Sequence, residues 1–148
     1  MISTVERVLF LKSVPLFKTI GGEDLAQVAR IAEEVYFGGG ETFIEQGTPG
    51  DCLFVLIDGQ VDVVVDGRVK VATVGARAIL GEMAVVTDAP RTATCTAAED
   101  TIALKIDRDA FWELMGQHPA VALGVIKQMS ERVEELHRRL REVEKSDV

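Results

Sequence analysis

The chain has 148 residues, a size typical of one domain, and 47% of them are hydrophobic, so it can bury a substantial core. Its formal net charge of −8 argues against direct binding of nucleic acid, which requires a basic surface. No apolar run approaches the ~20 residues of a membrane span, and the N-terminus lacks the pattern of a signal peptide. We therefore expect a cytoplasmic protein without direct nucleic-acid or membrane contacts.

Residues 4–35 have the spacing of helices interrupted at Pro15. Four apolar residues are spaced for one buried face of the first helix: Val5, Val8, Leu9 and Leu11. Phe17 and Ile20 are expected in the core. After a glycine turn at residues 21–24, a second helix has its own apolar side: Leu25, Val28, Ala29, Ile31 and Ala32.

From Val35 to about Ile106 the pattern changes to short strands separated by glycine turns. Residues 52–57 form a continuous apolar run, which is typical of a strand buried on both faces. Residues 61–65 and 68–71 flank an Asp-Gly pair and predict a hairpin. Strands this short and this closely spaced indicate an antiparallel roll or barrel.

After Ile106 the chain is expected to be helical again. Asp107 is placed to cap a short helix, a break follows at residues 116–119, and a long helix runs from about Ala120 towards Lys145. The long helix carries an a/d stripe with steps of three and four: Ile126, Met129, Val133, Leu136, Leu140 and Val143. This stripe predicts a homodimer through residues 126–143, with charged flanks that place Arg139 and Glu144 for pairing between parallel chains. The alternative is packing on the chain's own roll, which we expect for the early part through Leu123 and Ile126.

Cysteine and histidine are scarce in this chain, with two residues of each. Cys52 and Cys95 belong to no CxxC or Cys/His cluster, so we expect two reduced, buried thiols and no metal. The only histidines, His118 and His137, lie in the C-terminal helical part, and no nucleophile–base pair is visible. A roll without histidine also argues against a metal-dependent cupin. We therefore expect no enzyme.

The most informative stretch is residues 80–94. The carboxylate of Glu82 can accept hydrogen bonds from hydroxyls, and the guanidinium of Arg91 can bind phosphate oxygens with two parallel bonds. If Met83–Val85 begin a helical turn, their free amides add a further anion contact. Gly81 lets a ligand approach the backbone. These residues predict a site for a molecule with a sugar hydroxyl and a phosphate; the alternative is a surface loop with a Glu82–Arg91 ion pair.

Together these features resemble the cyclic nucleotide-binding domain of bacterial cyclic-AMP receptor proteins, protein kinase A regulatory subunits and cyclic-nucleotide-gated channels. Residues 47–59 resemble the early β-roll signature of that family, in which the glycines serve turns, and residues 80–94 resemble its phosphate-binding cassette. The resemblance implies an α+β fold, an antiparallel β-roll of double-stranded jelly-roll type flanked by N-terminal helices and a long C-terminal helix. It also implies one domain, 1–148, with helices at about 1–35, the roll at 36–106 and C-terminal helices at 107–145.

The resemblance also implies residue roles. Glu82 would bind the ribose 2′-hydroxyl and Arg91 the exocyclic phosphate oxygens, with backbone amides near Ala84 and Thr92 completing the phosphate site. The full ligand-binding set would be Gly81, Glu82, Met83, Ala84, Arg91, Thr92 and Ala93. The base would rest on Val61 and Val63. A hydroxyl directly after the arginine is associated in the family with binding guanine, so Thr92 favours cyclic GMP; cyclic AMP stays open, and a threonine also simply suits a strand.

The implied function is a regulatory or sensor module for cAMP or cGMP, without another cofactor. Such a module would transmit ligand occupancy through its C-terminal helix to an output domain or partner protein that the sequence does not identify. Lys127 and Arg132 are both candidates for a residue that covers the base. The alternative is a ligandless member of the fold that serves as a protein-interaction or dimerisation domain.

One departure from the family pattern is Arg77, where a glycine is common. A left-handed backbone at a non-glycine residue costs about 1 kcal/mol, so a different turn is expected at this position.

Overall fold

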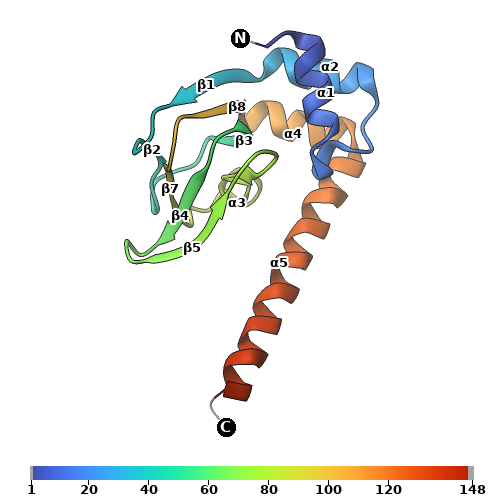
Figure 1. The fold of residues 1–148 in the computed structure, drawn as a ribbon. Helices are drawn as coiled ribbons and strands as arrows, with labels where there is room; N and C mark the ends of the chain where they lie inside the picture. The colour runs from blue at the N-terminus through green and yellow to red at the C-terminus, as the bar shows by residue number, and fades with distance from the viewer. Residues whose placement is uncertain (1, 147–148) are drawn as a thin grey trace.

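The computed structural model describes residues 2–146 as two packed β-sheets with helices at both ends of the chain (Figure 1). The N-terminal part contains α1 (Thr4–Lys12), the 3-10 helix η1 (Pro15–Phe17) and α2 (Gly22–Ile31). The strands are β1 (Glu33–Phe37), β2 (Thr42–Ile44), β3 (Cys52–Asp58), β4 (Val61–Val65), β5 (Val69–Val74), β6 (Ile79–Leu80), β7 (Thr94–Ala97) and β8 (Thr101–Asp107). The remaining helices are α3 (Glu82–Thr87), α4 (Arg108–Gln117) and α5 (Pro119–Ser146).

Both sheets have four strands, in the orders β1-β8-β3-β6 and β2-β7-β4-β5, and every neighbouring pair is antiparallel. This arrangement confirms the predicted antiparallel roll. β3 pairs with β8 on one side and β6 on the other, and its residues from Cys52 to Leu56 are all buried. The continuous apolar run therefore indicated a central, fully covered strand.

Left-handed residues shape two turns of the roll. The β4–β5 hairpin turns at Asp66 (φ 56°) and Gly67 (φ 68°), in agreement with the Asp-Gly signal. Arg77 also adopts a positive φ of 74°, so the expectation of a different turn at this position was wrong. The backbone N–H of Arg77 donates to the Leu56 carbonyl and its Nε donates to Ser13 Oγ, and these bonds offset the strain.

The N-terminal segment differs from its prediction in two respects. β1 begins at Glu33, so residues 33–35 belong to the roll and not to the helices, because they pair with β8 from Lys105 to Ala103. In α1, Leu11 is buried and Val8 is partly buried, whereas Val5 and Leu9 are 68% and 67% exposed. The cause is that α1 contacts only α2 and η1 closely and is covered on one side. Ile31, the last residue of α2, is also exposed, although it was predicted on the apolar side of that helix.

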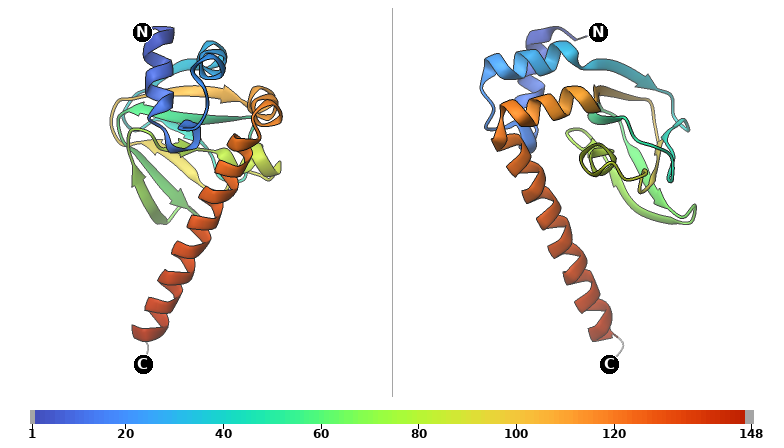
Figure 2. Two further views of the ribbon diagram at one scale, coloured as in Figure 1. Left: turned by 90° about the vertical axis from the view of Figure 1, so that its right-hand side faces the viewer. Right: turned by 180° about the vertical axis from the view of Figure 1, so that it is seen from behind.

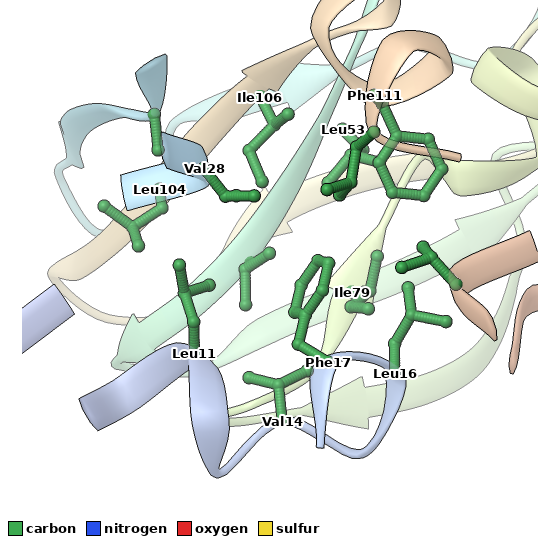
Figure 3. Packing of buried hydrophobic residues seen from close by; sticks show 14 of the residues in the cluster. Leu11, Val14, Leu16, Phe17, Val28, Leu53, Ile79, Leu104, Ile106 and Phe111 are labelled. Carbon is green, nitrogen blue, oxygen red and sulfur yellow. The ribbon is translucent and has the colours of Figure 1, made fainter. Parts of the chain in front are cut away.

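Two hydrophobic clusters hold these parts together. The larger one joins the helices to sheet β1-β8-β3-β6, with Phe17 and Phe111 facing Leu53, Ile79 and Ile106 (Figure 3). The smaller one lies between the sheets, where the Phe37 and Phe43 rings stack with centroids 4.1 Å apart. The predicted core residues Phe17 and Ile20 are both buried.

The C-terminal helices leave the roll at the end of β8. Asp107 occupies the N-cap position of α4 but makes no side-chain cap bond, and His118 separates α4 from α5. The 28 residues of α5 extend well beyond the roll in every view (Figures 1 and 2). No helix among residues 2–146 is both long and apolar enough to span a membrane.

The first turns of α5 pack mainly on η1 and α4, through other residues than the two predicted to face the roll. Val121 and Val125 are buried, whereas Leu123 and Ile126 are 65% and 59% exposed. Gly124 sets this orientation, because a Cβ there would lie 2.9 Å from Leu16 Cδ1, so the helix approaches η1 closely at this point. Leu123 and Ile126 therefore face away from the roll.

Candidate functional site

The predicted binding stretch follows β6 and forms a short helix against β3. Gly81, with φ 86°, is the N-cap residue of α3, and Asp88, with φ 62°, ends the helix. The helical turn predicted at Met83–Val85 is thus confirmed. β6 pairs with β3 at Phe54 and Val55, which fixes the place where α3 begins.

Arg91 is the centre of the site and is only 6% exposed. Its Nη1 donates to the Gly81 carbonyl at 3.1 Å and its Nη2 donates to Cys52 Sγ at 3.5 Å. Its backbone is bonded on both sides to the loop before β3: Arg91 N–H donates to Thr48 O, and Gly47 N–H donates to Arg91 O, each at 2.8 Å. Arg91 is therefore held by its main chain as well as by its side chain.

Two glycines make room for the guanidinium. A Cβ on Gly81 would collide with Nη1 of Arg91, and a Cβ on Gly50 would lie 2.8 Å from Nε of Arg91 and collide with the Ala84 side chain. The sequence predicts turns at the glycines of residues 47–59. For Gly47 (φ 88°) and Gly59 (φ 109°) this is right, but Gly50 has no positive φ and is needed for close packing.

Glu82 lies at the first position of α3 and is 5% exposed. Its Oε1 forms an ion pair with Nη1 of Arg132 on α5. The contact lacks hydrogen-bond direction, so this buried oxygen accepts no hydrogen bond from the described residues. Glu82 and Arg91 form no ion pair with each other in the part of the chain that the structure describes, so the predicted alternative of a Glu82–Arg91 pair was wrong.

Among residues 2–146, no acidic side chain forms an ion pair with Arg91. Guanidinium groups stay protonated in proteins, and the two groups that Arg91 contacts, a carbonyl and a thiol, are neutral. Burial raises the pKa of the Cys52 thiol, with the Arg91 charge opposing the rise, and burial raises the pKa of Cys95 to about 11. Both cysteines are free and buried, as expected. Since the pKa of both thiols is raised, neither supplies a negative charge to Arg91 near neutral pH.

The other predicted site residues differ in how exposed their side chains are. In the ligand-binding set, Ala84 is buried, Met83 and Ala93 are partly buried, and Thr92 is exposed. Thr92 lies before β7, which begins at Thr94, so the explanation that it simply suits a strand was wrong. Val61 is 0% exposed within the inter-sheet cluster, and its contact with a base stays a prediction. Val63 is partly exposed and stays a prediction.

Two residues of α4 that the sequence did not single out also contact the site. Nη2 of Arg108 donates to the carbonyls of Gly50 and Ala84, the second at 2.8 Å, and Nη1 pairs with Asp88 at 2.8 Å. The indole Nε1 of Trp112 donates to the Val85 carbonyl at 2.8 Å. The three carbonyl partners are 24 or more positions away along the chain, so no local pattern identifies them. Among residues 2–146, no group of three His, Cys, Asp or Glu side chains could hold a metal.

Comparison with known proteins supports the resemblance. The family model for the cyclic nucleotide-binding domain matches residues 34–118, more than half of the chain. The cAMP-dependent protein kinase regulatory subunit of Aspergillus fumigatus is 33% identical over 110 residues, which are 72% of this chain and 26% of that relative. The CRP-like cAMP-activated global transcriptional regulator of Mycobacterium tuberculosis is 26% identical over 137 residues, 90% of this chain and 61% of the relative. The chain thus spans about a quarter of the kinase subunit.

A solved structure shows the same fold over nearly the whole chain. The crystal structure of a cyclic nucleotide-binding domain from Methylobacillus flagellatus has a TM-score of 0.77 and 26% identity. The similarity covers 92% of this chain and 81% of that one.

The raised pKa of Cys95 predicts a loss of stability at alkaline pH. Between pH 9 and about 11 an unfolded chain releases the thiol proton while the folded chain keeps it, so the free energy of unfolding falls as pH rises. Below pH 9 this contribution is fully present. Cys95→Ala should make the fall shallower, measured by urea unfolding at a series of pH values. All other titrating groups are common to the wild type and the variant, so their effects on the free energy of unfolding cancel in the comparison. If the plots of unfolding free energy against pH run parallel for the two proteins, the prediction is contradicted.

Proposed function

This chain belongs to the cyclic nucleotide-binding domain family, and we propose that it is a regulatory module that binds cAMP or cGMP at residues 81–93. The observation that carries the proposal is the buried, uncompensated guanidinium of Arg91. A buried charge without a counter-charge costs several kcal/mol, and a cyclic phosphate would supply the missing negative charge. A guanidinium has five N–H donors, so several are left for phosphate oxygens.

The surrounding groups suit the rest of the ligand. The buried Oε1 of Glu82 accepts no hydrogen bond from the described residues, so it can accept one from a ribose hydroxyl. Gly81 lies between β6 and α3, where the amides of Met83 and Ala84 face the same end of the short helix. The exposed hydroxyl of Thr92 and the partly exposed Val63 are our candidates for contacts with the base. These roles support binding of either nucleotide and involve no catalytic step.

Titration calorimetry of nucleotide-free protein with cAMP and with cGMP tests the function. We expect saturable binding that Arg91→Ala weakens by about a hundredfold or more, because charge-assisted hydrogen bonds to phosphate are lost. Arg30→Ala is a matched control, since Arg30 is an exposed arginine on α2, remote from residues 81–93 in the sequence, and it should bind like the wild type. No heat from either nucleotide with the folded wild type would reject the sensor and favour the ligandless interaction domain.

We further propose that ligand occupancy reaches α5 through Glu82. When the ligand is captured, α3 shifts, the contact of α4 near Phe111–Met115 with the roll repacks, and α5 moves. Arg132 supports this route because it is on α5 and forms an ion pair with the buried Glu82 carboxylate. A ribose hydroxyl that donates to the same carboxylate competes with Arg132 for its oxygens, so the two positions of α5 bind the ligand unequally, as a switch requires.

Hydrogen exchange of the α5 amides measures this transmission. Adding saturating nucleotide should change protection around residues 126–136 in the wild type, and Arg132→Gln should lose that change while still binding the ligand. Arg139→Gln is the matched control, because Arg139 is on the same helix but pairs locally with Glu135 at 3.3 Å. Equal protection with and without nucleotide in the wild type would contradict transmission through α5.

The exposed stripe of α5 supports the predicted homodimer. Ile126, Val133, Leu136, Leu140 and Val143 are between 49% and 61% exposed, and only Met129 of the stripe packs against the core. The spacing is that of a coiled-coil dimer, so we propose a second copy of the chain as the partner. So short a stripe is marginal by itself, and a concentration-dependent equilibrium is expected.

Sedimentation velocity over a range of protein concentrations tests the dimer. Leu136→Glu should leave a monomer with an unchanged fold, because a charge in the stripe is desolvated on association. Glu142→Gln, an exposed change outside the stripe, should dimerise like the wild type. A monomeric wild type at all concentrations would refute the dimer.

A further inference from the structure

Arg108, the first residue of α4, connects three segments of the binding site. Its guanidinium donates to the carbonyl of Gly50 in the loop before β3 and to the carbonyl of Ala84 in α3, and it pairs with Asp88 at the end of α3. Its side chain is 29% exposed, and its Nε is buried without a hydrogen-bond partner among the described residues. A planar guanidinium can bridge separate acceptors in this way, whereas a lysine ammonium cannot present the same fork.

The contact between Arg108 and α3 matters because α3 is too short to be stable by itself. A helix of six residues is far shorter than the ~12–15 residues that isolated helices need in water. The last four carbonyls of a helix lack partners inside it. In α3 two of these, from Ala84 and Val85, accept hydrogen bonds from Arg108 and Trp112 of α4. The positive charge of Arg108 also lies at the favourable, C-terminal end of the helix dipole.

Arg108 also affects Arg91 indirectly, because it bonds to Gly50, which packs against the Arg91 side chain. Gly50 packs so closely that a Cβ on it would lie 2.8 Å from Nε of Arg91 and would also collide with Ala84. Arg108 bonds to the carbonyls of both Gly50 and Ala84 and so holds the loop and α3 together around the guanidinium. A shift of either segment would move the walls of the space that Arg91 occupies.

We propose that Arg108 is a positioning residue for cyclic nucleotide binding: it sets the position of Arg91 by joining the loop before β3, α3 and α4. The proposal rests on the proposed function in that the ligand is a cyclic nucleotide. Arg108 acts on Arg91 indirectly, because its two terminal nitrogens are directed to Gly50, Ala84 and Asp88. As a consequence, α3 and α4 move as one unit when Arg91 takes up a ligand.

Three variants of the 148-residue chain test this role. Arg108→Gln removes the charge and the fork, and Asp88→Asn removes only the ion pair at an exposed position where asparagine tolerates a positive φ. Arg30→Gln removes one positive charge from the exposed face of α2 and is the control. The first measurement uses no nucleotide: amide exchange in residues 82–88 is compared with exchange in β3 and β8. The indole N–H signal of Trp112, the single tryptophan, reports the bond to Val85 in the same samples.

In Arg108→Gln we expect α3 to exchange at least tenfold faster than in the wild type, with β3 and β8 unchanged, and the indole signal to shift. The second measurement is affinity for cAMP and cGMP, which should fall by about tenfold in Arg108→Gln, by less in Asp88→Asn and not in Arg30→Gln. Uniformly faster exchange throughout the roll would mean a general loss of stability and would overturn a positioning role.

The two measurements separate this inference from the proposed function. If the wild type binds and Arg108→Gln binds equally well, the positioning role is wrong and the sensor function stands. If Arg108→Gln leaves exchange in α3 unchanged, the inference is also overturned, whether or not any nucleotide binds. If the wild type binds neither nucleotide, the proposed function fails and the positioning role for nucleotide binding falls with it. Faster exchange confined to α3 together with weaker binding supports the inference.

Discussion

The burial of one arginine is the constraint on which the rest of the site depends. The Arg91 side chain is nearly inaccessible, and among the described residues its guanidinium donates hydrogen bonds to a carbonyl and a thiol, both neutral. Water cannot hydrate it freely and no acidic group in the described residues neutralises it. The surrounding structure therefore holds it in place through hydrogen bonds to its side chain and to its main chain.

The fold meets this constraint by bringing together segments that are far apart in the chain. The loop before β3 bonds to the backbone of Arg91, while Gly50 and Gly81 leave space on either side of its side chain. β3 lies in the centre of its sheet, between β8 and β6, so the loop that precedes it and the helix that follows β6 start from firmly paired strands. The rigidity of the site comes from these strands.

The short helix α3 links the site to the C-terminal helices at both of its ends. Its first residue, Glu82, pairs with Arg132 of α5, and its last carbonyls accept hydrogen bonds from Arg108 and Trp112 of α4. Too short to be stable alone, α3 adopts the position that its partners in α4 and α5 allow. A ligand that alters the partners of Glu82 or Arg91 can for this reason affect both helices.

Local sequence was sufficient for most of the elements and for the family, and it singled out Glu82 and Arg91, which the structure shows to be buried. Strand β3, the hairpin at Asp66–Gly67, helix α5 and the pair Glu82 and Arg91 follow from apolar periodicity, turn residues and donor–acceptor chemistry, which depend on near neighbours. Tertiary structure alone decided which side of α1 and α5 is buried, that Gly50 serves packing and not a turn, and that Glu82 pairs with Arg132 rather than Arg91. It also placed Arg108 against Gly50, 58 positions away. Such contacts arise from how the sheets and helices pack, and a pattern of neighbouring residues carries no record of that packing.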